Sequence, residues 1–387
     1  MEQQHADVFE KFKDANGNFN EKLVTDVEGL LELYEASHLR IHREDILDEA
    51  FEFTSTKLKF IATTKLRPSL LEEQVKYSLS QSYHQGLPRL EARRFISIYE
   101  QHPNHNQTLL TLAKLDFNYL QNLHRKEVSD ICKWWKELDV AANYHMLEIE
   151  LWNVITGFWR WDIGCLNDLP EYMKLIYESL YNIYEEAEQE LGKHGRANCI
   201  RYAIKELQKT IQAYMTEAKW LKNNYTPTMA EYIQTSAISS GYPVLITISF
   251  IGMGDLATED IFKWVTSKPK LVKASAIIAR IMDDIVSNEF EQKREHVASI
   301  IECYMREFDV SREEAIQEMK KRVTDAWKDT DEECLKLTKV PIPFLTRILN
   351  MSRFMDVMYK DEDCYTHAGG KMKECIETLL VNAVPIM

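Results

Sequence analysis

Three oxygen-bearing side chains recur at a helical spacing between residues 280 and 294. Asp283, Ser287 and Glu291 are four residues apart, so on an α-helix they form one stripe along a single face. Two carboxylates and a hydroxyl are hard oxygen donors, which suit Mg²⁺, or Mn²⁺, in a site completed by water and phosphate oxygens. The stripe therefore predicts a divalent-cation site. A solvated acidic helix face is the alternative that the spacing alone leaves open.

Two arginines flank this stripe. Arg280 lies about one helical turn before it, and Arg294 lies about one turn after it. A guanidinium group stays charged and can bind a phosphate group through two hydrogen bonds at once. The preceding segment, 271–282, is apolar, so the stripe is expected to face the inside of a helical bundle. These residues together favour a site for a phosphorylated ligand.

The elements that must position these residues are helices. The chain has 387 residues, 45% of them hydrophobic, which excludes global disorder. It has only 12 Gly and 10 Pro, too few for the many turns of a β-sandwich or barrel. Thr228 and Ser311, each followed three residues later by Glu, are expected to open helices. No strand pattern is present, so the predicted class is all-α. Apolar residues recur at helical spacing over 24–37, 44–60, 109–138, 169–191, 196–223 and 271–295.

Composition excludes several classes of protein. The net charge of −14 disfavours binding to nucleic acid. No apolar run approaches the roughly 18 residues of a membrane-spanning helix. The seven cysteines stand singly, without a CxxC pair, as in a reducing compartment. The charged N-terminus lacks the apolar core of a signal peptide and the composition of a plastid transit peptide. We therefore expect a cytoplasmic protein.

The segment around Asp283 resembles the second metal-binding motif of class I plant terpene synthases, which reads Asn/Asp-Asp-x-x-Ser-x-x-x-Glu. The likeness extends over nearly the whole chain and is strongest to angiosperm sesquiterpene synthases. It implies a partial N-terminal α-barrel domain at 1–114 and a C-terminal class I terpenoid synthase helical bundle at 115–387. The segments that carry the likeness include 7–53, 113–139, FWRWDI at 158–163, EAKWLKNNYTPTMAEY at 217–232 and SSGYPVLITISFIGMGD at 239–255.

The resemblance also implies an activity. A sesquiterpene synthase is a carbon–oxygen lyase that ionises and cyclises farnesyl diphosphate, with Mg²⁺, and releases diphosphate. It is expected to act as a monomer. Asp283, Ser287 and Glu291 would then hold one Mg²⁺, and Arg280 and Arg294 would contact the diphosphate of the prenyl substrate.

A helix break is expected at Ser239, Ser240 and Gly241, ahead of Pro243. In the family, a kinked helix at this place turns its exposed carbonyl groups toward the substrate carbocation. The resemblance assigns that role to the three residues. A simple proline kink is the alternative.

Three residues near the C-terminus match those with which the family closes the mouth of its pocket. They are Tyr359, Asp363 and Tyr365. The spacing between Tyr359 and Asp363 is one residue shorter than the family pattern, so Tyr359 fits it least.

The sequence also departs from the family. The first metal motif, DDxxD, occurs nowhere in the chain, although it should precede the RWDI segment at 160–163 by about 20 residues. An internal block is therefore expected to be missing after about residue 141, and the N-terminal domain is expected to be short. The loss would leave apolar helix faces open to water and remove carboxylates that hold metal. It predicts a poorly stable or inactive chain, and leaves open the alternative of a non-enzymatic relic or a partner-binding helical protein.

Other conspicuous residues favour ordinary structural roles. Glu44, Asp45 and Asp48 form an EDxxD sequence in the N-terminal domain, away from the expected bundle, and a solvated acidic face explains them. His367 is expected to be structural. The tryptophans 152, 159 and 161 are expected to pack rather than to face a cation.

Overall fold

The computed structural model describes residues 7–64, 70–138, 161, 163–169, 171–291, 297–336 and 339–386. These ranges contain helices and no strand, apart from a single β-bridge between Lys13 and Phe19. The all-α class predicted from the sequence is confirmed. None of the helices within these ranges is both long and apolar enough to cross a membrane.

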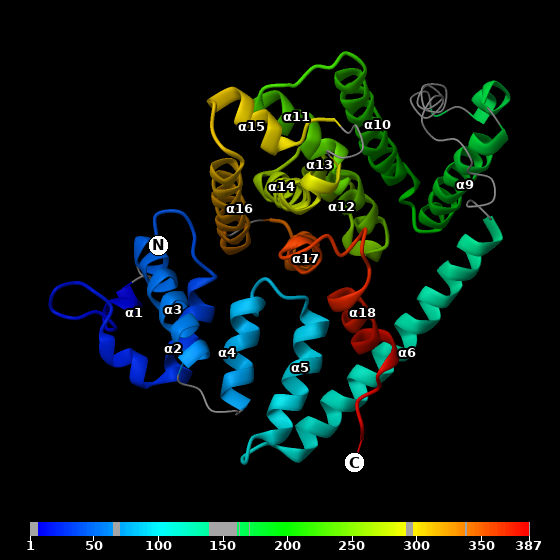
Figure 1. Cartoon of the computed structure of the whole chain (residues 1–387). Coiled ribbons are helices and arrows are strands. Elements are labelled where there is room, and N and C mark those ends of the chain that lie inside the picture. Colours follow the sequence, from blue (N-terminus) through cyan, green and yellow to red (C-terminus); the bar gives the residue numbers. More distant parts are fainter. Residues whose placement is uncertain are drawn as a thin grey trace.

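In Figure 1, α1, α2 and α3 lie at one side of the molecule, α4 and α5 lie below the bundle, and α6 extends toward α9. The core between α2, α3 and α4 is apolar, and Leu30, Leu58 and Val75 are fully buried in it. The side chain of Asp26 begins α2 by accepting a hydrogen bond from the backbone N–H of Gly29. The elements are α1 (Asp7–Glu10), η1 (Glu21–Thr25), α2 (Val27–Ser37), α3 (Asp45–Thr64), α4 (Leu70–Ser80), α5 (Pro88–Gln101) and α6 (Gln107–Leu138).

The remaining helices form a bundle around α14, which α11, α12, α15, α16 and α17 all contact. The bundle contains η2 (Ile163–Asp168), α9 (Glu171–Lys193), η3 (Ala197–Cys199), α10 (Ile200–Lys222), α11 (Met229–Ser239), α12 (Tyr242–Ile251), η4 (Gly254–Leu256), α13 (Glu259–Thr266), α14 (Lys270–Glu291), α15 (Ile300–Phe308), α16 (Arg312–Leu335) and α17 (Ile342–Tyr359). After it come α18 (Gly370–Ile376) and a short π-helix, η6 (Glu377–Val381).

Local sequence signals explain where several of these helices begin. Capping boxes open α11 at Thr228 and α16 at Ser311, as predicted. A third capping box, at Ser299, opens α15. The apolar residues of α14 explain its central place, because Leu271, Ile278 and Ile281 are each at most 1% exposed.

The region 109–138, in which apolar residues recur at helical spacing, belongs to a single helix, α6, which runs along one edge of the molecule (Figure 1). It passes without a break through residue 114, where the sequence places a domain boundary; that boundary stays a prediction. Its buried residues end at Gln121. Beyond it, large apolar side chains are exposed, among them Ile131 at 62% and Trp135 at 56%. These exposed side chains agree with the expectation that apolar helix faces are exposed to solvent.

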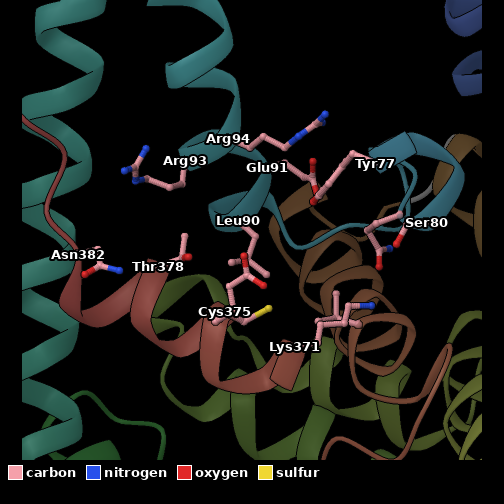
Figure 2. Close-up of a pocket in the computed structure, with 13 residues that line it drawn as sticks. Tyr77, Ser80, Leu90, Glu91, Arg93, Arg94, Lys371, Cys375, Thr378 and Asn382 are labelled. Carbon is pink, nitrogen blue, oxygen red and sulfur yellow. The ribbon is translucent and has the colours of Figure 1, made fainter. Parts of the chain in front are cut away.

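Contacts between distant parts of the chain join the N-terminal helices to the bundle. Nε2 of His84 lies 2.7 Å from Oδ1 of Asp331 on α16. Asp48 of α3 pairs with Lys328 of α16 at 2.6 Å and with Arg40 at 3.0 Å, so the EDxxD sequence has a structural role at this carboxylate. The C-terminal segment returns to pack on α5 and α6. A cavity that we call the α5–α18 cavity lies between α4, α5, the end of α17, α18 and η6 (Figure 2).

Replacement of Phe250 by Ala is expected to lower the free energy of unfolding by about 3–5 kcal/mol. The ring is fully buried and packs edge-on against Phe344, with centroids 4.8 Å apart. Phe308→Ala is the matched control, because that ring is 51% exposed and its loss should cost about 1 kcal/mol or less. Urea unfolding followed by circular dichroism measures both values, and equal losses would contradict the placement of the core.

Candidate functional site

Helix α14 carries the predicted stripe. Asp283 and Ser287 lie one turn apart on it, and the side chain of Asp283 is 27% exposed. Ser287 is buried, and its Oγ has no hydrogen-bond partner in the part of the chain that the structure describes. Glu291 is the last residue of α14, but its side chain, like the whole of Arg294, lies outside the described residues.

The open hydroxyl of Ser287 tests whether this stripe suits a metal ion. A buried polar atom without a partner is rare in folded proteins and costs about 1–3 kcal/mol. A cation bound by this oxygen and by the partly exposed carboxylate of Asp283 would remove that cost. The donor set of hydroxyl and carboxylate matches a hard divalent ion such as Mg²⁺. The described residues of the stripe therefore fit the predicted metal.

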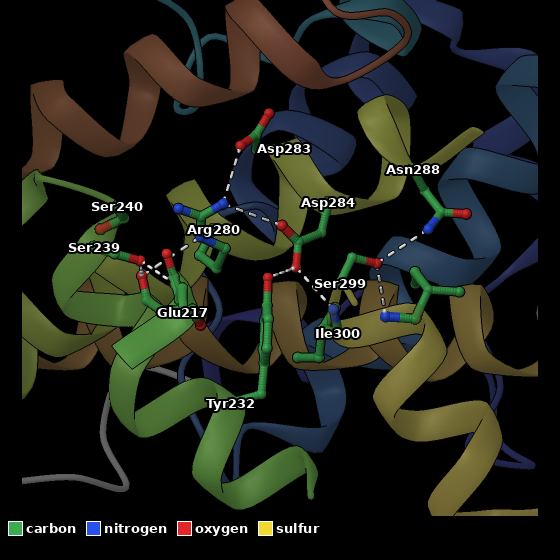
Figure 3. A network of polar contacts seen from close by, with 12 residues as sticks. Glu217, Tyr232, Ser239, Ser240, Arg280, Asp283, Asp284, Asn288, Ser299 and Ile300 are labelled. Carbon is green, nitrogen blue, oxygen red and sulfur yellow. Dashed lines mark hydrogen bonds and ion pairs between the residues drawn. The ribbon is translucent and has the colours of Figure 1, made fainter. Parts of the chain in front are cut away.

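Arg280 lies at the centre of a polar network (Figure 3). Its Nη1 is 3.3 Å from Oδ2 of Asp283 and 3.3 Å from Oδ1 of Asp284, and its Nε donates to the backbone oxygen of Ser236 at 3.4 Å. Burial acts to lower the pKa of Arg280, but the negative charges around it, with that of Asp284 the largest, outweigh burial and raise the pKa above its ordinary value. The site therefore keeps a permanent, fixed cation beside Asp283.

Asp284 is a buried anchor that the sequence analysis did not identify. It is 1% exposed, and Oδ2 accepts hydrogen bonds from the hydroxyl of Tyr232 at 2.7 Å and from the backbone N–H of Ile300 at 3.0 Å. Burial raises the pKa of Asp284, while Arg280 opposes this effect. Asp284 thus connects α14 to α11 and α15 (Figure 3). One signal could have found it, because residue 284 is seven positions after Ile277 and falls on the apolar face of the helix.

The predicted helix break is present between α11 and α12. Gly241 has a φ of +75°, which favours glycine, and Pro243 stands in the first turn of α12. Ser239 donates a hydrogen bond to Oε1 of Glu217 on α10, and Ser240 donates to the backbone within its own turn. The break therefore lies against α10, close to the backbone that Arg280 contacts. The role of its carbonyl groups stays a prediction.

The structure brings the predicted C-terminal residues to the same side of α14. Tyr359 ends α17, and Oδ1 of Asp363 accepts hydrogen bonds from the backbone N–H groups of Tyr365 at 3.0 Å and Thr366 at 2.9 Å. Burial raises the pKa of Tyr359, and the negative charges of Asp283 and Asp363 raise it further. Tyr365 is 76% exposed. Their role at a pocket mouth stays a prediction.

A cavity of about 250 Å³ adjoins this network. Tyr214 and Glu217 of α10 line it together with Arg280, Asp284 and Ser299. Tyr214 and Glu217 were missed by the sequence analysis. No local signal marks them, because their neighbours come from helices that are distant in the chain.

Another acidic cluster is already neutralised. His42, Asp329 and Glu332 each place one possible ligand atom within 4.8 Å of the others, and no further group of this kind occurs within the described ranges. The ammonium of Lys270 lies 2.7 Å from Asp329 and 2.6 Å from Glu332. This cluster is therefore an ion-pair network rather than a second candidate metal site.

Two family models match the sequence. The model described as the N-terminal domain of terpene synthases matches residues 4–79. The model described as the metal-binding domain of the terpene synthase family matches residues 139–329, which include α14.

Named plant proteins are similar over nearly the whole chain. The sequence is 44% identical both to a (−)-germacrene D synthase of Vitis vinifera and to (+)-delta-cadinene synthase isozyme A of Gossypium arboreum. Each alignment covers 98% of this chain, with 76% of the first relative and 77% of the second. The alignment to the Vitis protein spans 427 positions, 40 more than the 387 residues of this chain, so at least 40 of its positions have no residue here.

Solved structures share the fold. Isoprene synthase from grey poplar leaves (Populus x canescens) superposes with a TM-score of 0.89 at 27% identity, covering 99% of this chain and 80% of that chain. A limonene synthase with 2-fluorolinalyl diphosphate also gives 0.89, at 25% identity, covering 98% of this chain and 79% of that one. Another structure of the poplar enzyme, with a TM-score of 0.88, is in complex with three Mg²⁺ ions and dimethylallyl-S-thiolodiphosphate.

The neighbouring aspartates are expected to respond differently to mutation. Asp284→Ala removes one of the two carboxylates that pair with the partly buried Arg280 and leaves a buried tyrosine hydroxyl and a backbone N–H without their acceptor, so it should lower the free energy of unfolding by about 3–5 kcal/mol. Asp283→Ala removes a partly exposed ion pair and should cost about 1 kcal/mol or less. Urea unfolding measures both. A larger loss for Asp283 than for Asp284 would show that the anchor is misidentified.

Proposed function

Because the chain belongs to the terpene synthase family, we propose that it is a sesquiterpene synthase that uses Mg²⁺ to ionise and cyclise farnesyl diphosphate. The resemblance stated from the sequence motifs is confirmed, and the family consists of lyases that act on prenyl diphosphates. Its metal-binding domain implies dependence on a divalent metal. The observation that carries the proposal is the open Ser287 hydroxyl beside Asp283 and the fixed Arg280.

Asp283 and Ser287 would hold the Mg²⁺ ion, together with Glu291. Bound there, the ion would neutralise the charge that develops on the departing diphosphate. Arg280, held by Asp283 and Asp284, would offer its remaining N–H groups to diphosphate oxygens, with Arg294 as the second arginine. The anchoring of Arg280 reduces the reorganisation that binding requires, because the guanidinium is already in place.

In the proposed reaction, the bond between C1 of the farnesyl chain and the diphosphate oxygen breaks, and its electron pair leaves with diphosphate. A double bond of the same chain attacks the allylic cation to close a ring, and loss of a proton ends the sequence. The carbonyl groups at Ser239, Ser240 and Gly241 would stabilise the cation. Tyr359, Asp363 and Tyr365 would close the mouth and exclude water.

A second candidate is a relic that binds the prenyl diphosphate without turnover, or a helical protein that binds a partner. The absence of a DDxxD sequence and the alignment positions without a residue here favour it. Each lost contact to developing charge can lower the rate about 10²–10³-fold. For either candidate, we propose a monomer in the cytoplasm.

The test of the proposal incubates the full chain with farnesyl diphosphate and Mg²⁺ and analyses hydrocarbon products by gas chromatography with mass detection. A cyclic sesquiterpene supports the synthase. Metal-dependent binding without product supports the relic, and an absence of metal-dependent binding contradicts both diphosphate-binding readings.

Calorimetry with a non-reactive farnesyl thiolodiphosphate is expected to show that Asp283→Asn and Ser287→Ala each weaken metal-dependent binding at least about tenfold, or 1.4 kcal/mol. The physical reason is the loss of one oxygen ligand from the metal site. Asp325→Asn, at an exposed position of α16, is the control and should bind like the parent chain. Equal binding by all three variants would contradict the proposal that Asp283 and Ser287 hold the metal ion.

A further inference from the structure

The α5–α18 cavity is separate from the cavity beside α14, because no residue that lines one also lines the other. Its volume is about 530 Å³, within the range of about 300–1,000 Å³ in which proteins bind small molecules. Figure 2 shows Tyr77, Glu91 and Arg94 on the side of the N-terminal helices, and Lys371 and Cys375 on α18. A ligand in this space would touch both the N-terminal helices and the C-terminal segment.

Glu91 offers this cavity a hydrogen-bond acceptor. The residue is 9% exposed, and the hydroxyl of Tyr77 donates to its Oε1 at 2.5 Å, whereas Oε2 has no hydrogen-bond partner among the described residues. Gly86 lies against the same carboxylate, because a Cβ added there would be 2.3 Å from Oε1. Burial raises the pKa of Glu91 to about 7. The carboxylate is thus held in place with one oxygen satisfied and one open.

Gln81 adds a second open acceptor. Its Nε2 donates to Oδ2 of Asp356 at 2.7 Å, which fixes the orientation of the amide. Its Oε1 has no partner in the described part of the chain, and the residue is only 4% exposed. Two buried acceptors without donors cost free energy that a ligand hydroxyl group could recover.

The charged side chains that line the cavity indicate which charge the ligand carries. Arg93, Arg94 and Lys371 contribute three cations, against the two carboxylates of Glu91 and Glu374. Nζ of Lys371 makes no hydrogen bond within the described ranges, and its ion pair with Asp361 is long, at 3.6 Å. Because the lining carries an excess positive charge, it disfavours a free ammonium ligand and favours an acidic group near Lys371.

We propose that the α5–α18 cavity binds a small organic anion that carries at least one hydroxyl group, either a hydroxycarboxylate or a sugar phosphate. The hydroxyl donates to Glu91 or to Gln81, and the acidic group pairs with Lys371. This binding site is independent of the metal stripe on α14 and of the reaction proposed there.

Isothermal titration calorimetry on the full chain tests the proposal with L-malate and glycerol 3-phosphate as probes. Saturable binding of either one is expected, and the tighter probe distinguishes a carboxylate from a phosphate ligand. Succinate lacks the hydroxyl group and glycerol lacks the acid, so each should bind at least about tenfold more weakly than its partner probe. Failure of both probes to bind, or equal binding of malate and succinate and of glycerol 3-phosphate and glycerol, would overturn the proposal.

Substitutions in the cavity lining test whether the probes bind in the α5–α18 cavity. Lys371→Met should weaken binding of the better probe at least about tenfold, because it removes the cation that pairs with the acidic group. Gly86→Ala should also weaken it, since the new methyl group displaces the Glu91 carboxylate. Lys373→Met is the matched control, because Lys373 lies on the same helix, is 71% exposed and does not line the cavity.

Unchanged binding in Lys371→Met, or equal loss in Lys373→Met, would contradict the assigned site. Thermal unfolding confirms that each variant folds. If Gly86→Ala does not fold, the comparison of Lys371→Met with Lys373→Met still tests the assigned site.

Discussion

The buried carboxylate of Asp284 is the contact on which the geometry of the α14 site depends. A charged group in a protein interior is stable only when it is paired and hydrogen-bonded, and this one meets Arg280, Tyr232 and the backbone of Ile300. Those partners belong to three helices, so one carboxylate sets their relative positions. The result is a fixed guanidinium beside the more open Asp283. Two adjacent residues of the same type thereby have different tasks, because one faces the core and the other faces the site.

The same division applies to the hydroxyl groups of the site. Ser239 has a partner in Glu217, and Ser240 bonds to its own helical turn, so both help to shape the break between α11 and α12. Ser287 has no partner among the described residues, although it is buried like Ser239. A buried hydroxyl group without a partner, one helical turn from a partly exposed carboxylate, is the feature expected of a residue that binds a ligand.

The second half of α6 exposes apolar side chains at one edge of the molecule. The bundle packs tightly around α14, whereas the second half of α6 exposes Ile131, Trp134 and Trp135. Large apolar side chains gain free energy only when they leave water, so this helix contributes less to the core than its length suggests. Relatives carry at least 40 aligned positions that this chain does not have. Exposed apolar surface and missing carboxylates are the two consequences that the sequence predicts for a missing internal block, which stays a prediction.

Local patterns in the sequence determined the positions of many helices and the shared face of two candidate metal ligands. Apolar periodicity predicted the helices, capping sequences predicted the starts of α11 and α16, and the spacing of Asp283 and Ser287 placed them on one face. Those features depend on neighbours within about one helical turn, so a linear sequence contains them. The sequence places Asp284 on the apolar face of α14, but it could not show that this carboxylate binds Tyr232 and Ile300 or that Glu217 accepts from Ser239. It also could not show that Ser287 has no partner among the described residues, or that Glu91 and Lys371 line one cavity. Only the tertiary structure decided these, because burial and hydrogen-bond partners arise when helices distant in the chain pack together.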